Sequence, residues 1–278
     1  MKAWVSLGLA VSLALATGAS AQPSTQSSAP AVQLWRLDCG TIQFRDFGAF
    51  FSDTNELPRG PRAASDSCYL IRHGSQFLLW DTGLPAALKG NPTQIGDGLT
   101  GTLDRTIIEQ LAELKLTPAN INIVGISHMH ADHLGQVGSF PNAKLIIGKA
   151  DFEGTVGARD PFGPWRVAAA KLQLAHGGDV DIFGDGSVIA LNMPGHTPDH
   201  LSLLVKLASG NVLLTGDLYH STMARNTKQV PGFNTSRAET LASMDRFERL
   251  AKSYRAKVII QHEPADIAKL PAFPDAAQ

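Results

Sequence analysis

Four side chains that can bind metal ions lie within six consecutive positions of this chain. The segment SHMHADHLG, residues 127–135, contains His128, His130, Asp132 and His133. In an extended segment, residues two apart point to the same side, so the first two histidines should converge on one point. The aspartate and the last histidine follow where the chain must turn, and they can reach a second point nearby. Imidazole and carboxylate are ligands of zinc and similar divalent ions, and a set without cysteine favours an open, catalytic site.

Three later segments place similar side chains directly after apolar, strand-like runs. MPGHTPDH contains His196, LLTGDLYH contains Asp217, and VIIQHEP contains His262. Loops at strand ends build sites on a rigid sheet. A single histidine in such a place is usually a surface residue, but three such residues together with the cluster predict a metal site.

Strands and helices are mixed along the whole chain. Residues 68–83 resemble a hairpin that turns at Gly74 and Ser75, and residues 236–254 resemble a helix that Ser236 and Glu239 begin with a capping-box pattern. The other expected strands are 32–40, 121–130, 143–149, 186–196, 201–210, 211–217 and 257–264; the other expected helices are 103–116 and 165–175; and 219–234 is expected to be irregular. Hairpins in both halves favour two mixed sheets covered by helices.

The pattern H-x-H-x-D-H, followed in order by His196, Asp217 and His262, resembles the metallo-β-lactamase superfamily. The resemblance extends over essentially the whole chain after the N-terminal segment. It implies an α/β (α+β) fold, a four-layer αββα sandwich of two mixed β-sheets flanked by helices. It also implies a site for two divalent metal ions between the sheets, with Zn²⁺ as the expected metal.

The resemblance also assigns roles to individual residues. It implies that His128, His130 and His196 bind one ion, that Asp132, His133 and His262 bind the other, and that Asp217 bridges them. Asp81, in LLWDTG, matches an aspartate that orients a ligand histidine from behind. We expect His200, in the same loop as His196, to support that ligand by hydrogen bonding.

The segments around these residues are similar to the N-acyl homoserine lactonase group. They are CYLIRHGSQFLLWDTGLP, SHMHADHLGQVG, PGHTPDHLSLLV and GDLYH. The similarity implies that the substrate is a small acylated lactone, opened by attack of a metal-bridging hydroxide, with Asp132 passing a proton to the leaving oxygen. The alternative is hydrolysis of phosphotriesters or other esters by the same site. Hydrolysis of β-lactams is disfavoured, because β-lactamases of this superfamily usually lack an aspartate at the position of Asp217.

One position departs from the lactonase group, which often has a tyrosine three residues after the bridging aspartate. Here that position is His220, and Tyr219 lies one residue earlier. Either side chain could hold the developing oxyanion. The segment FRDFGAFF, residues 44–51, could form an apolar loop over the site. Phe50 and Phe51 are its candidate contacts with an acyl chain, with core packing as the alternative.

The N-terminus has the pattern of a cleaved secretory signal peptide. Lys2 precedes an apolar run that ends in Ala19-Ser20-Ala21. We expect a signal peptide over 1–21, a flexible leader over 22–31 and one hydrolase domain over 32–278, in a protein exported to the periplasm or secreted. The apolar run is too short for a comfortable membrane span, and no other segment is long enough, so no stable membrane insertion is expected.

The composition narrows the classes of partner. The chain has 24 basic and 25 acidic residues and no basic run longer than two, which argues against nucleic acid as a partner and against RNA processing. A protein that sequesters metal without catalysis is the remaining other class, and the open ligand set speaks against it. Cys39 and Cys68 could form a disulfide or remain two free thiols. The apolar loops are compatible with a homodimer.

Overall fold

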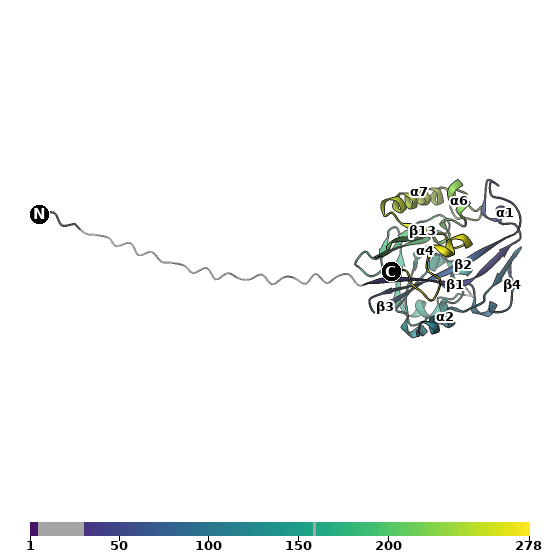
Figure 1. The fold of residues 1–278 in the computed structure, drawn as a ribbon, viewed down its shortest axis with the longest axis horizontal. Coiled ribbons are helices and arrows are strands. Elements are labelled where there is room, and N and C mark those ends of the chain that lie inside the picture. Colours follow the sequence, from purple (N-terminus) through teal and green to yellow (C-terminus); the bar gives the residue numbers. More distant parts are fainter. Residues whose placement is uncertain (5–30, 158–159) are drawn as a thin grey trace.

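The computed structural model describes residues 1–4, 31–157 and 160–278. In this part of the chain two β-sheets face each other, and helices cover their outer faces (Figure 1). The larger sheet contains, in spatial order, β4 (Thr93–Gly96), β5 (Leu99–Thr102), β1 (Val32–Phe44), β2 (Arg62–His73), β3 (Gln76–Trp80), β6 (Ile123–Gly125), β7 (Lys144–Gly148) and β8 (Leu172–Ala175). The smaller sheet contains β13 (Lys257–Ile259), β12 (Gly210–Leu214), β11 (Leu201–Leu207), β10 (Val188–Asn192) and β9 (Val180–Asp181). The α-helices are α1 (Phe47–Phe51), α2 (Ile107–Glu113), α3 (Ala131–Leu134), α4 (Lys149–Gly154), α5 (Gly163–Val167), α6 (Thr222–Thr227) and α7 (Arg237–Ser253).

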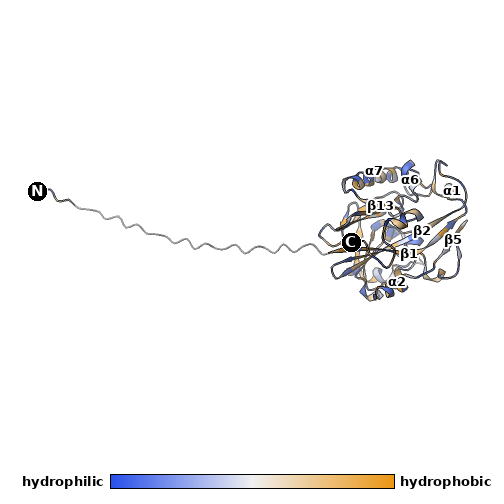
Figure 2. Cartoon of the chain, in the orientation of Figure 1, coloured by the Kyte–Doolittle hydropathy of each residue, from blue (hydrophilic) through white to orange (hydrophobic). Residues whose placement is uncertain are grey.

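Buried hydrophobic clusters between the layers confirm the expected αββα sandwich. Trp80 packs between the sheets with Leu203 of the smaller sheet. Leu79, its neighbour in β3, points to the opposite face and packs with Leu111 of α2, as the period of two in a strand requires. Phe247 of α7 packs on the outer face of the smaller sheet. Figure 2 shows that α2 and α7 also carry hydrophilic residues, as expected for helices that cover a sheet and face water.

Both sheets contain a hairpin followed by a parallel strand. The β2–β3 hairpin turns at Gly74 and Ser75, as predicted, and β6 runs parallel to β3. The β11–β12 hairpin is followed by β13, parallel to β12. Because parallel strands end at the same edge of a sheet, the loops after β3 and β6 are neighbours, and so are those after β12 and β13. These loops hold most of the predicted metal ligands.

Two of the secondary-structure predictions are wrong. Residues 165–175 were expected to be a helix, but α5 ends at Val167 and residues 172–175 form β8. Leu172 pairs with Leu145 of β7, so pairing at the sheet edge outweighs local helix propensity. The segment 219–234, expected to be irregular, contains α6, whose first turn Ser221 caps.

Other elements are confirmed with shorter bounds. The helix expected over 103–116 begins only at Ile107, because Thr106 and Glu109 form a capping box there. Helix α7 starts where predicted, since the Ser236 side chain accepts a hydrogen bond from the backbone N–H of Glu239. Strands β6, β10 and β13 end before their polar residues, which must leave the sheet to turn toward the site.

Cys39 and Cys68 form a disulfide bond, which settles the question left open by the sequence. Both side chains are fully buried. Cys39 lies where the β1–β2 register shifts between Asp38 and Gly40, and Cys68 lies on β2. The bond therefore joins two neighbouring strands in the core of the larger sheet.

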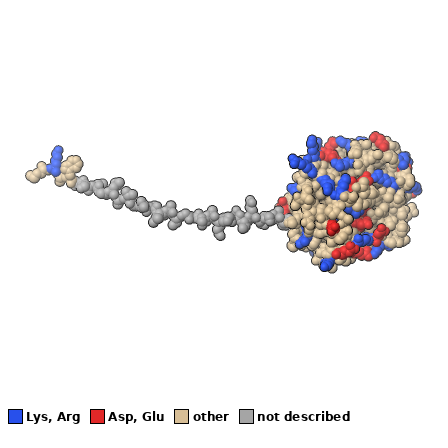
Figure 3. All heavy atoms as spheres, in the orientation of Figure 1, with Lys and Arg blue, Asp and Glu red and all other residues tan. Residues whose placement is uncertain are grey.

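The N-terminal predictions fall mostly outside the described residues. Of the predicted signal peptide and leader, only residues 1–4 and Ala31 are described, so both stay predictions. Within the described ranges, none of the helices has the length and apolar character needed to span a bilayer. The face seen in Figure 3 carries both acidic and basic side chains, in agreement with the formal net charge of −1.

Candidate metal centre

The histidine-rich loop runs from β6 into α3 at the edge of the larger sheet. His130 occupies the N-cap position of α3, and Asp132 and His133 lie on the helix itself. Nε2 of His128 lies 2.9 Å from Nδ1 of His130, which confirms that these two rings converge. The other two side chains reach a separate group of ligands, as their position after the turn predicts.

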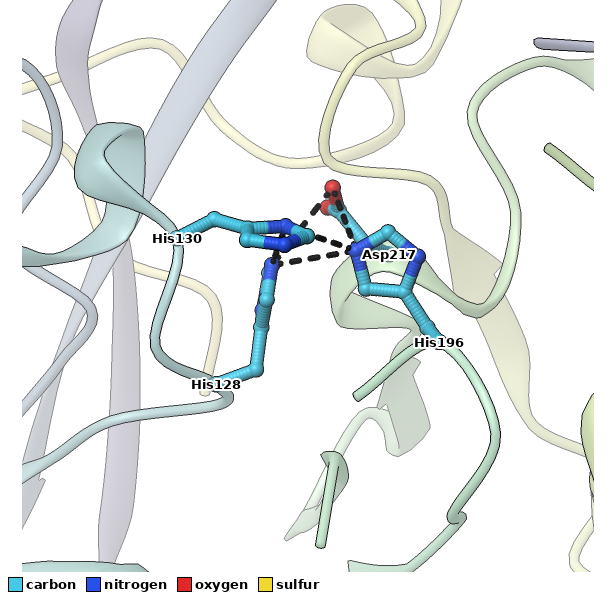
Figure 4. A group of neighbouring side chains, drawn as sticks. All are labelled: His128, His130, His196 and Asp217. Carbon is cyan, nitrogen blue, oxygen red and sulfur yellow. Dashed lines mark hydrogen bonds and ion pairs between the residues drawn. The ribbon is translucent and has the colours of Figure 1, made fainter. Parts of the chain in front are cut away.

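The remaining ligands come from the smaller sheet. His196 follows β10, Asp217 lies in a 3-10 turn after β12, and His262 follows β13. The structure thus brings all seven predicted ligands into two groups, in each of which the ligand atoms lie within 4.8 Å of one another: His128, His130, His196 and Asp217 form the first, and Asp132, His133 and His262 form the second. Figure 4 shows the side chains of the first group pointing toward one another, with His128 and His130 on one loop and His196 and Asp217 on two others.

The carboxylate of Asp217 lies between the two groups. Its Oδ2 is 3.5 Å from Nε2 of His196, and its Oδ1 is 3.0 Å from Nε2 of His262 and 3.3 Å from Nε2 of His133. One oxygen therefore faces each group, which is the arrangement expected of a bridging ligand.

Hydrogen bonds beside the first group fix which nitrogen of His196 carries the proton. Thr240 Oγ1 donates to a helix carbonyl and so accepts from Nδ2 of Asn234. Asn234 Oδ1 is then free to accept from Nδ1 of His196 at 2.9 Å, which leaves His196 Nε2 without a proton. This Nε2 lies 3.0 Å from Nδ1 of His130 and 3.2 Å from Nε2 of His128.

Burial lowers the pKa of His128 and His196 well below the usual value, so both rings are neutral. The ring nitrogens of His128, His130 and His196 converge on one point, and a divalent ion there would accept a lone pair from each neutral ring. The first group therefore fits a divalent ion.

The second group favours positive charge for a different reason. Burial opposes the protonation of His262, but Asp217 outweighs it and raises the pKa of His262 to about 9. Against the same effect of burial, Asp217 and Asp81 raise the pKa of His133 well above its usual value. Burial disfavours the Asp217 carboxylate, yet His262 and His133 hold its pKa well below the usual range.

Two buried atoms of this region, His133 Nε2 and Asp217 Oδ1, have no hydrogen-bond partner among the described residues. A divalent cation would take up both atoms and supply the positive charge that the carboxylates stabilise. The residues of both groups therefore fit a pair of divalent metal ions.

Asp81 lies behind the site, in contact with His133, one of the predicted ligands. Its Oδ1 accepts from the backbone N–H of Ser127 at 2.7 Å, and its Oδ2 lies 3.1 Å from Nδ1 of His133. The backbone carbonyl of Ser65 holds Nδ1 of His262 in the same way, at 2.9 Å. Such contacts would direct the opposite ring nitrogen toward a bound metal ion.

His200 supports a different ligand from the one expected. Its Nδ1 donates to the carbonyl of Met193 at 3.1 Å, and its Nε2 accepts from the backbone N–H of Asp217 at 3.0 Å. No hydrogen bond joins it to His196 among the described residues. The expectation was wrong because the ring of His200, at the end of this loop just before β11, turns its Nε2 toward the end of β12, where Asp217 follows.

Tyr219 does not reach the site, which contradicts its expected catalytic role. Its hydroxyl lies 3.0 Å from Glu248 Oε1, and its ring packs against Phe247 of α7. His220 points the other way: its Nε2 is 3.0 Å from Asp217 Oδ2, and its ring stacks on Phe51. Adjacent residues of an extended segment face opposite sides, so only one of the two could line the pocket.

A cavity of about 330 Å³ opens beside the ligands. Its polar edge consists of ligand side chains and His220, and the rest of its wall is apolar. The lining residues are Ile42, Phe44, Phe50, Phe51, Leu84, Pro85, Ile95, Leu99, His130, Ala131, Asp132, Asp217, His220, Phe233 and His262. Phe50 and Phe51 thus lie where they were predicted.

Several residues of the site carry no sequence signal. Phe233 forms part of the pocket wall, and Asn234, its neighbour, holds His196. Ile95 and Leu99, from the short strands β4 and β5, were not expected there either. No motif surrounds these residues, because their contacts depend on how distant segments pack.

The match to known proteins agrees with this geometry. A family model described as the metallo-beta-lactamase superfamily matches residues 63–262. The chain is 32% identical over 265 residues to the N-acyl homoserine lactonase AttM of Rhizobium radiobacter, which covers 87% of this chain and 98% of that one.

The fold is also similar to that of solved lactonase structures. An N-acyl homoserine lactone hydrolase with its product N-hexanoyl-L-homoserine bound at the catalytic metal center aligns with a TM-score of 0.74 at 21% identity, covering 90% of this chain and 100% of that chain. AidC, a dizinc quorum-quenching lactonase, aligns with a TM-score of 0.63 at 16% identity, covering 90% of each chain. On its sequence match and its fold, this chain belongs to the metallo-β-lactamase superfamily.

Proposed function

We propose that this protein is a metal-dependent hydrolase that opens the lactone ring of N-acyl homoserine lactones and so quenches quorum-sensing signals. The relative AttM is an N-acyl homoserine lactonase, and the aligned hydrolase binds an acyl homoserine product at its metal centre. The observation that carries the proposal for this chain is the pocket, which joins a metal-binding edge to an apolar wall.

The apolar wall of the pocket suits an uncharged group of the substrate. None of its lining residues is Lys or Arg. An anionic group pressed against the apolar wall would lose its hydration without gaining a cationic partner there. An N-acyl homoserine lactone has no charge, a polar ring for the metal edge and an apolar chain for the wall. β-Lactam antibiotics and phosphate monoesters usually carry an anion, so this wall suits them less well.

Two bound divalent cations would supply a water-derived nucleophile at neutral pH and polarise the lactone carbonyl. The chain's own groups then handle the proton and the developing charge. Asp132 lies at the pocket edge with its side chain 22% exposed and would carry the proton to the leaving ring oxygen.

His220 would stabilise the developing oxyanion from the pocket wall. Burial lowers its pKa, so the ring is neutral, and its Nε2 faces Asp217 Oδ2 at 3.0 Å. That nitrogen therefore carries the ring's single proton, which Asp217 Oδ2 accepts in this structure. With Oδ2 bound to a metal ion, this N–H would be left to the substrate oxygen. A donor held beside the reacting carbonyl is the role expected of an oxyanion-hole group.

For the metal we propose Zn²⁺, because the ligands are histidine nitrogens and carboxylate oxygens and AidC is a dizinc enzyme. We further propose that the protein is exported. The N-terminal pattern and the Cys39–Cys68 disulfide both support an oxidising compartment. The homodimer stays a prediction, and light scattering on the purified protein would test it.

Hydrolysis of phosphotriesters is the second candidate, because four phenylalanines line the pocket and would accept an aryl leaving group: Phe44, Phe50, Phe51 and Phe233. Phosphotriesters are also uncharged, so charge does not separate the two substrates. The ratio of kcat/KM on a long-chain acyl homoserine lactone to that on an aryl phosphotriester decides between them.

The first experiment is to measure acid release by the zinc-loaded mature protein with N-decanoyl homoserine lactone, beside a sample treated with EDTA. Fast release that EDTA abolishes is the expected result. Asp217→Asn and His130→Ala should each remove nearly all activity, because each deletes a ligand from the shared site. No release by protein that binds its full complement of zinc would refute the lactonase proposal.

A further inference from the structure

A single buried glutamine fastens two walls of the pocket to each other. Gln229 lies in the loop after α6 and is only 4% exposed. Its Oε1 accepts from the hydroxyls of Ser52 at 2.5 Å and Thr54 at 2.7 Å, and its Nε2 donates to Glu56 Oε2 at 3.0 Å. We call these four residues the glutamine clip.

Backbone and charge contacts strengthen the same junction. The N–H of Asp53 donates to the carbonyl of Val230 at 2.9 Å, and the side chain of Asp53 forms an ion pair with Arg237 at the start of α7. The segment 52–56 is therefore held against residues 229 and 230 at several points, although they are far apart in the sequence.

The clip lies directly behind the aromatic wall of the pocket. Phe50 and Phe51 precede its first segment, and Phe233 follows its second. The rings of Phe50 and Phe233 are 5.1 Å apart, and Phe51 stacks on His220 at 4.1 Å. Gln229 itself does not line the cavity. It can therefore influence the substrate only through the spacing of the aromatic rings.

We propose that Gln229 is a positioning residue that sets the preference for the acyl chain by holding the Phe50–Phe51 wall against the Phe233 wall. This inference rests on the proposed lactonase function. In Gln229→Met, the buried hydroxyl of Ser52 and the exposed hydroxyl of Thr54 lose their acceptor and Glu56 loses its donor, so the segment 52–56 should move to give Ser52 a new partner. The acyl chain of the substrate would lose contacts with the aromatic wall, whereas the metal ligands would keep their positions.

The test compares kcat/KM for N-decanoyl and N-butanoyl homoserine lactone. A buried methylene contributes about a fourfold factor, so loosening of two of them should lower the decanoyl-to-butanoyl ratio by about 15-fold in Gln229→Met. The change should appear mainly in KM, because the reacting groups are not moved. The double variant Gln229→Glu/Glu56→Gln exchanges acceptor and donor within the clip and should restore the ratio.

Gln110→Met is the matched control. Gln110 is also buried, at 1% exposure, and it bonds to the backbone of Asp38 from α2, on the opposite side of the molecule from α1 and α6 (Figure 1). The variant Gln110→Met should lower the stability of the fold but leave the decanoyl-to-butanoyl ratio unchanged. An equal fall of the ratio in this variant would overturn the specific role of Gln229.

Hydrogen–deuterium exchange separates this inference from the proposed function. In Gln229→Met, the segments 47–56 and 229–234 should lose protection together, and in Gln110→Met they should not. If the wild type opens no lactone, the lactonase proposal fails, and exchange still shows whether the clip joins the two walls. Unchanged protection of these segments in Gln229→Met would show that the clip does not hold the two walls together. Joint loss of protection with an unchanged ratio overturns its role in chain preference.

Discussion

The backbone N–H of Asp217 donates to Nε2 of His200 at 3.0 Å, so a buried histidine holds the bridging aspartate from behind. Burial lowers the pKa of His200 to about 3, which keeps the ring neutral and its Nε2 free to accept. Gly216 leaves the necessary space, because a Cβ there would lie 2.6 Å from that nitrogen.

His200→Ala should therefore weaken metal binding by about 10- to 100-fold, since contacts that orient ligands contribute effects of this size. Competition with a chromophoric chelator measures the affinity. His176→Ala is the control, because the side chain of His176 is 69% exposed and its ion-pair partner, Asp199, is not one of the seven metal-binding residues. Wild-type affinity in the His200 variant would show that Asp217 needs no such support.

His220→Phe should lower kcat on lactones by about 10²- to 10³-fold, the usual cost of removing an oxyanion donor. The phenyl ring keeps the stacking on Phe51, so KM should change little. His220→Tyr returns a donor to the same wall and should recover part of the rate. Steady-state kinetics on zinc-loaded samples of equal metal content measures both variants, and full kcat in the Phe variant would exclude the proposed role.

Loss of the Cys39–Cys68 disulfide should destabilise the fold by about 3 to 4 kcal/mol, from the chain entropy of a loop with a sequence separation of 29. Urea unfolding of the double variant Cys39→Ser/Cys68→Ser, beside the oxidised wild type, gives the difference in free energy of unfolding. A difference below about 1 kcal/mol would mean that the unfolded state is already compact without the bond.

Asp151 should make stability depend on pH. Its carboxylate is buried and accepts from the Thr197 hydroxyl at 2.6 Å, and burial raises its pKa to about 6 from 3.8. The folded state thus favours the protonated form. Its stabilising contribution is complete below pH 3.8 and is lost as the pH rises through about 6, a change of about 3 kcal/mol.

The variant Asp151→Asn cannot ionise and should lack this change. The free energy of unfolding of the variant minus that of the wild type should therefore increase between about pH 4 and pH 7. A loss of stability caused by the amide itself is the same at every pH and does not affect this change. Urea unfolding of both proteins at several pH values measures the difference. A difference independent of pH would show that Asp151 is not protonated in the folded protein.

The layered fold and the metal ligands could be predicted because their signals are local. His128 and His130 alternate after a buried strand, and Leu79 and Trp80 alternate between two cores. Such periodicity survives folding because it reflects the geometry of a strand. The helix expected over 165–175 failed for the opposite reason, since only its pairing with β7 makes residues 172–175 a strand.

The sequence by itself determined which side chains could bind metal and that they would lie at strand ends, and its resemblance to a known superfamily implied hydrolytic chemistry. Only the tertiary structure decided that Tyr219 turns away while His220 faces the pocket, that His200 holds Asp217, and that Gln229 joins two aromatic walls. The physical reason is the distance along the sequence between the residues that determine each feature. Ligand type and spacing are properties of short segments, whereas each of these later roles depends on which distant surfaces the packing of two sheets brings within hydrogen-bond distance.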